Sequence, residues 1–68
     1  MNKKDKSIFK QAKRVVKNLE DNIYKGRVLI ETLKENGIYA QNYPSLIQAI
    51  ADNCPWLTRL GDDEYKKS

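Results

Sequence analysis

The sequence predicts an all-α fold, a small bundle of three to four helices. Apolar residues in the first half recur at helical spacing, and no segment alternates long enough to indicate a pair of strands. The 68 residues fit at most one domain with a marginal core, because a chain of this size buries only about 60% of its unfolded surface. We expect a flexible basic N-terminus over 1–6, a single helical domain over 7–61 and a polar tail over 62–68.

The first expected element is a long amphipathic helix over residues 8–25, with Ser7 as a candidate N-cap and Asp5 as the competing choice. Its apolar side chains fall within about 100° of helical arc. They are Ile8, Ala12, Val15, Val16, Leu19 and Ile23. This stripe is the expected core face of the helix.

Gly26 leaves two alternatives open. A glycine in a helix interior costs about 1 kcal/mol relative to alanine, which favours a break. Yet Ile30 and Leu33 would continue the apolar face if the helix ran on. An unbroken helix from Ser7 to Asn36 would be about 45 Å long. The rest of the chain could not cover such a helix, so this alternative would nearly require the homodimer that the sequence otherwise merely allows.

Turn signals divide the second half of the chain. Asn36 and Gly37 predict a helix stop, with the glycine in the left-handed conformation. Pro44 suits the first position of the next helix, which is expected to end near Asn53. Pro55 is expected to open another short helical turn. We therefore expect two short helices after the long basic one.

Positive charge is concentrated in the first half. The net charge is +4, but residues 1–34 hold ten basic and four acidic side chains, and residues 35–68 hold three and five. Five lysines recur at intervals of three or four residues, which places them on the side of the helix away from the apolar stripe, with Arg14 beside them. They are Lys3, Lys6, Lys10, Lys13 and Lys17. This asymmetry points towards an anionic partner: nucleic acid, an acidic protein face or anionic lipid.

The residue types present argue against catalysis. The chain has no histidine, and its one cysteine, Cys54, can form neither an internal disulfide nor a zinc site. No nucleophile has a base beside it, so we expect no enzyme activity, no metal and no cofactor. No apolar run approaches the roughly 20 residues of a membrane span. A lone thiol fits the reducing cytoplasm.

The sequence argues against a helix-turn-helix motif. With Gly37 as the turn, the recognition helix would run through Pro44, which would break it. The segment Leu46–Asn53 contains no Lys or Arg, and only Gln48 could reach a base edge.

Two functions remain. The first is a small regulatory or accessory protein that docks stoichiometrically on a protein partner of unknown identity, through the basic helix face and exposed aromatic residues. The alternative is a sequence-non-specific nucleic-acid-binding protein that sets the lysine stripe on phosphates. The candidate binding residues for these functions are Lys6, Lys10, Lys13, Arg14, Lys17, Tyr39, Tyr43 and Trp56.

Overall fold

Three helices and a three-stranded antiparallel sheet make up the computed structural model, which describes residues 3–68, with side chains from residue 6 onward. The prediction of an all-α fold, and of a small helical protein, is therefore wrong, and the fold is mixed α/β. In chain order the elements are α1 (Lys3–Lys17), β1 (Asn22–Lys25), α2 (Gly26–Glu35), α3 (Tyr43–Asn53), β2 (Leu57–Arg59) and β3 (Glu64–Lys67).

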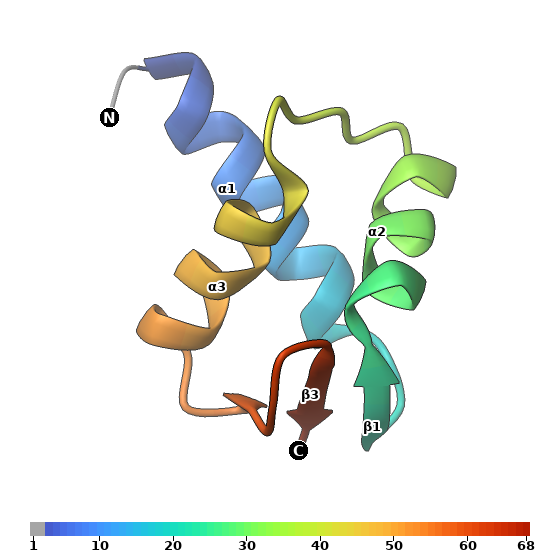
Figure 1. Cartoon of the computed structure of the whole chain (residues 1–68). Coiled ribbons are helices and arrows are strands. Elements are labelled where there is room, and N and C mark those ends of the chain that lie inside the picture. Colours follow the sequence, from blue (N-terminus) through green and yellow to red (C-terminus); the bar gives the residue numbers. More distant parts are fainter. Residues whose placement is uncertain (1–2) are drawn as a thin grey trace.

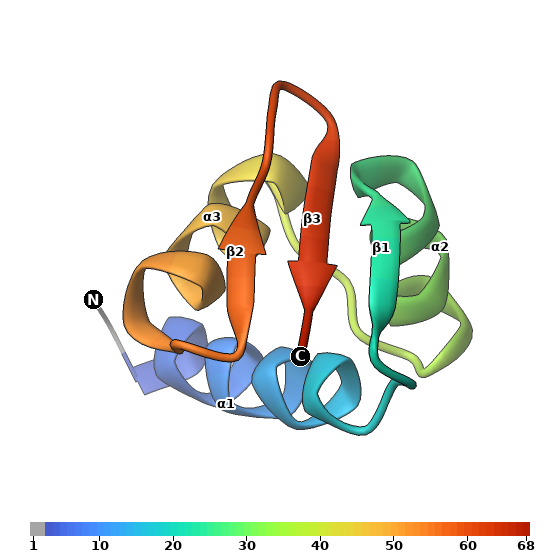
Figure 2. The same cartoon turned by 90° about the horizontal axis from the view of Figure 1, so that it is seen from below.

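The sheet places its last strand in the centre, in the order β1-β3-β2 (Figures 1 and 2). Tyr65 of β3 lies opposite Tyr24 of β1 and Arg59 of β2. Along β3, Tyr65 and Lys67 are buried while Glu64 and Lys66 are exposed. The helices therefore cover one face of the sheet, and the other face is open (Figure 2).

All three helices contribute to one core beneath the sheet. Leu29 and Leu33 of α2 are fully buried, and their spacing of four residues places them on one face of the helix. Ile50 of α3 is also fully buried. From α1 the core takes the small side chains of Ala12 and Val16. The complete set of buried apolar residues is Ala12, Val16, Leu29, Leu33, Ile38, Ile47, Ile50, Cys54, Leu57 and Tyr65.

Helix α1 ends earlier than the apolar pattern predicts. Its last residue is Lys17, and residues 22–25, expected to be helical, form β1 instead. Ile23 thereby leaves the apolar stripe and lies on the open face of the sheet, 52% exposed. The prediction of a helix to residue 25 fails because these residues take their backbone hydrogen bonds from β3.

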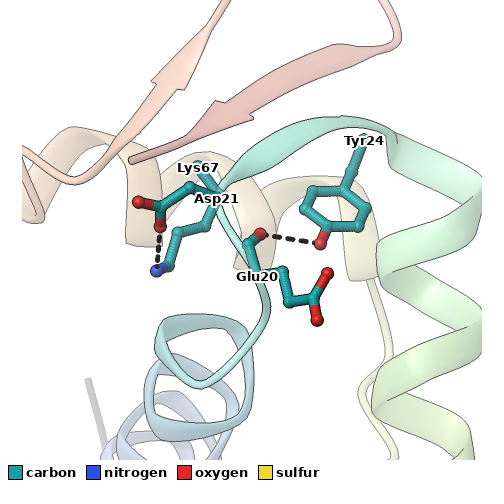
Figure 3. A network of polar contacts seen from close by, with 4 residues as sticks. All are labelled: Glu20, Asp21, Tyr24 and Lys67. Carbon is teal, nitrogen blue, oxygen red and sulfur yellow. Dashed lines mark hydrogen bonds and ion pairs between the residues drawn. The ribbon is translucent and has the colours of Figure 1, made fainter.

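Two contacts hold the turn after α1, one within the turn and one with the distant end of the chain (Figure 3). The hydroxyl of Tyr24 donates to the carbonyl oxygen of Glu20 at 2.7 Å. The ammonium of Lys67, a residue only 8% exposed, pairs with Asp21 at 3.0 Å. The end of α1 is thus attached to β1 within the turn and to β3 across the chain.

Gly26 begins a helix instead of interrupting one. Its N–H donates to the carbonyl oxygen of Asp63 at 2.9 Å, so the loop before β3 lies against the start of α2. A Cβ on Gly26 would lie 2.6 Å from Oδ1 of Asp63. A methyl group here would therefore displace the carboxylate end of the Asp63 side chain. Since no helix runs through Gly26, the argument that nearly required a homodimer no longer applies.

The predicted stop after α2 and the start of α3 are confirmed. Gly37 has a φ of 76°, and the N–H of Ile38 donates to the carbonyl oxygen of Leu33 at 2.9 Å, as in a Schellman motif. Asn42 caps α3 by accepting from the N–H of Ser45 at 3.1 Å, and Pro44 lies in the first turn.

The end of the chain differs from the prediction. The short helical turn expected after Pro55 is β2, and residues 64–67 of the expected polar tail are β3. At the N-terminus, the expected flexible segment 1–6 falls partly outside the described residues, and residues 3–6 belong to α1. Within residues 3–68, no helix is both long and apolar enough to cross a membrane, as the sequence predicts.

Candidate functional site

The outward side of α1 carries a row of cations, which we call the lysine face. It lies opposite Ala12 and Val16, whose side chains are fully buried, so the amphipathic pattern fixes which way the cations point. Its members are the five predicted basic residues Lys6, Lys10, Lys13, Arg14 and Lys17.

The lysine face is continuous, and none of its cations forms an ion pair with a carboxylate of residues 6–68. From Lys6 to Lys17 it extends about 16 Å along the helix. All its members are exposed except Lys13, which is half-buried with Nζ 5.8 Å from the centre of the Phe9 ring. Residues 6–17 of α1 include no acidic side chain, and the ion pair found among residues 6–68 joins Lys67 to Asp21. Residues 6–17 therefore present five cations to a polyanion, and the next exposed carboxylates along the chain are Glu20 and Asp21, beyond the end of the helix.

The three predicted aromatic residues do not form one exposed cluster. Tyr39 lies in the connection after α2 and is 71% exposed. Tyr43 begins α3, is half-buried and donates its hydroxyl to the carbonyl oxygen of Ile38 at 2.8 Å. Trp56, also half-buried, follows the other end of α3, which is about 15 Å long. Tyr43 and Trp56 cover the core, and only Tyr39 is left as an exposed anchor.

The arrangement of the elements revises the rejection of a helix-turn-helix. Helices α2 and α3 follow each other directly along the chain, joined by residues 36–42. Pro44 does not break α3, because in the first turn its missing N–H is not needed. In a helix-turn-helix the second helix is the recognition helix, which here would be α3. The argument from Pro44 is therefore wrong, although the argument from missing cations still holds.

The surface of α3 has no free cation to place on nucleic acid. The helix contains no Lys or Arg, and the nearby guanidinium of Arg59 is bound within the molecule. Its Nη1 donates to Oε1 of Gln48 at 2.9 Å and its Nε to the carbonyl oxygen of Gly61 at 2.8 Å. Gln48 in turn donates to Asp52 at 2.8 Å. These bonds link α3 to the hairpin loop along an open groove of about 400 Å³.

Carboxylates dominate this side of the molecule. Asp52 of α3 and the loop residues Asp62 and Asp63 are exposed, and together we call them the acidic face. Figure 2 shows the loop between β2 and β3 at one end of the strands and α1 at the other. The lysine face and the loop carboxylates Asp62 and Asp63 therefore lie at opposite ends of the strands.

Sequence reasoning missed the hairpin and with it the acidic face. A usable signal was present, since Gly61 and Asp62 are turn residues between two short segments that could pair. Lys67 was also missed, and a buried lysine gives no apolar signal. Among residues 3–68, no group of three or more His, Cys, Asp or Glu side chains is placed to hold a metal ion.

What the site can do is to offer cations on one helix to an anionic partner, with the loop carboxylates Asp62 and Asp63 at the other end of the strands. Comparisons of the chain with protein-family models, with curated proteins and with solved structures found no match.

Proposed function

We propose that this protein is a non-catalytic, sequence-non-specific nucleic-acid-binding protein that contacts phosphates through the lysine face of α1. The observation that carries the proposal is the unbroken row of five cations without a carboxylate among them. Cations set on phosphates release condensed counterions, which gives affinity without sequence readout.

The composition of the lysine face favours backbone contacts over base reading. Four of its five residues are lysines, and Arg14 is the one arginine. Lysine acts as a point charge on phosphate, whereas arginine is the residue that pairs with guanine through two hydrogen bonds. Two consecutive helices are no more than an analogy with a helix-turn-helix, and a fold alone does not assign a function. The proposal therefore depends on the charges.

The test is the salt dependence of binding to a duplex oligonucleotide, for the wild type and two matched variants. Lys10→Gln/Arg14→Gln/Lys17→Gln removes three cations from the lysine face. Lys25→Gln/Arg27→Gln/Lys66→Gln removes two lysines and an arginine elsewhere, all exposed, so both variants have the same net charge. Each lost phosphate contact reduces the log–log slope by about 0.9, so we expect a reduction of about 2.7 for the first variant.

The control variant should keep most of the slope of the wild type. Equal losses in both variants would show that net charge, and not the lysine face, governs binding. No binding to single- or double-stranded oligonucleotides at low salt would contradict the proposed function altogether.

A second candidate is docking on another protein, and the observation that favours it is the exposed Tyr39. Tyrosine is a frequent energetic anchor at protein interfaces. A nuclease-treated pull-down separates the two functions. A partner that survives nuclease treatment and is lost in Tyr39→Ala would favour docking on protein, whereas loss of all partners with nuclease would favour nucleic acid.

A further inference from the structure

We infer that the acidic face excludes nucleic acid from α3 and the hairpin, so that a duplex docks on α1 alone, with the hairpin loop directed away from it. The inference rests on the proposed function and adds the orientation of the bound protein. It also assigns a role to residues outside the lysine face.

The fold itself offers two surfaces on which a duplex could dock. One is the outward side of α1, and the other is α3 with the adjacent hairpin, the surface that a helix-turn-helix protein presents to the major groove. The start of α3 is shaped for such a role: Asn42 caps it, and Ser45 and Gln48 lie on its accessible side. Shape alone therefore does not choose between the surfaces.

The charges of the two surfaces decide which of them can bind a duplex. Asp52, Asp62 and Asp63 are exposed on the second surface. Arg59 is the one cation of α3, β2 and the loop between β2 and β3, and Lys25 at the end of β1 lies opposite Glu64. Arg59 cannot turn outward without breaking its hydrogen bonds to Gln48 and to the carbonyl oxygen of Gly61. Phosphates approaching this surface would meet carboxylates with no free cation to offset them, and like charges brought together cost several kcal/mol.

Because the lysine face and the hairpin loop lie apart, excluding nucleic acid from the loop also fixes the orientation of the bound protein. Because α1 and the hairpin loop lie at opposite ends of the strands (Figure 2), a duplex held by the lysine face keeps the loop carboxylates Asp62 and Asp63 on the side remote from its phosphates. Both charge patterns therefore favour the same pose.

The test combines amide chemical-shift mapping with charge reversal. A 12-base-pair duplex is titrated into the wild type, into Asp52→Lys/Asp62→Lys and into the control Glu31→Lys/Glu35→Lys. The control makes the same charge change at two exposed positions of α2. In the wild type we expect perturbed amides in residues 6–17 and none in residues 60–63 or along α3.

The charge-reversed variant should gain a second docking surface. Its slope should steepen by about 1.8, from two added phosphate contacts, and perturbed amides should appear in α3 and the loop. The control should bind more tightly than the wild type without new perturbations there. If the lysines disturb the fold, the test is repeated with Asp52→Asn/Asp62→Asn, which removes the two negative charges with nearly isosteric side chains.

Failure of this inference is distinct from failure of the proposed function. Perturbed amides in α3 and the loop of the wild type, together with dependence on the lysine face, would overturn the orientation alone. So would a charge-reversed variant that behaves like its control. Absence of duplex binding in the wild type would overturn the proposed function and the orientation together.

Discussion

Helix α1 and the β2–β3 hairpin are both charged and exposed, but they are attached to the molecule in different ways. In α1, packing and charge belong to separate residues: Ala12 and Val16 are buried, and the cations lie on the other side. In the hairpin, Leu57 and Tyr65 supply buried apolar side chains, but the charged Lys67 is also buried, and its ammonium pairs with Asp21. The charges of α1 can therefore be changed without affecting the fold, whereas some charges of the hairpin cannot.

Leu57→Ala, in the hairpin, is expected to have the largest effect on the free energy of unfolding. Leu57 is the one buried side chain of β2, at 1% exposure, so its truncation should leave a cavity under the hairpin. We expect the free energy of unfolding to fall by about 2–5 kcal/mol, measured by urea denaturation. The control Thr58→Ala, on the exposed side of the same strand, should change it by less than about 0.5 kcal/mol. Equal losses for the two would mean that Leu57 does not anchor the hairpin.

An intermediate effect is expected where the hairpin meets α2. Gly26→Ala brings a methyl group to within 2.6 Å of Oδ1 of Asp63, which must then move. In the Asp63→Ala background this conflict is absent. Because Oδ1 is the end of an exposed side chain that can rotate away, a double-mutant cycle of unfolding free energies should give a coupling of about 0.5 kcal/mol between the two sites. Additive effects would show that the loop can shift freely, and would weaken the contrast with α1.

The smallest effect, and one of opposite sign, is expected on the lysine face. Like charges four residues apart on a helix cost about 0.2–0.5 kcal/mol per pair, and Lys6–Lys10, Lys10–Arg14 and Lys13–Lys17 are such pairs. Lys10→Gln/Arg14→Gln/Lys17→Gln should therefore raise the free energy of unfolding slightly while weakening binding. A loss above about 1 kcal/mol would mean that these side chains support the fold.

The parts of the fold that could be predicted are those specified by neighbouring residues. Gly37 sets the stop after α2 through its own backbone conformation, and Asn42 and Pro44 start α3 with their own side chains. The lysine face was predictable for the same reason, because helical spacing alone places its members together.

The sheet could not be predicted in this way, since its strands carry misleading patterns. One inward residue of β3 is Lys67, while the apolar Ile23 and Leu60 are about half exposed, at 52% and 51%. The end of α1 at Lys17 likewise has no glycine or proline to mark it, and depends on the pairing of Asp21 with Lys67. The acidic face was missed because it exists only once the hairpin has formed.

The central position of β3 determines the order in which the molecule can assemble. The helices α2 and α3 can nucleate from local contacts, but β1 and β2 share no hydrogen bonds with each other and each needs β3. The ion pair that secures the end of α1 joins residues 46 positions apart. Cleavage before Glu64 would therefore deprive both outer strands of their partner and release the turn that follows the cationic helix.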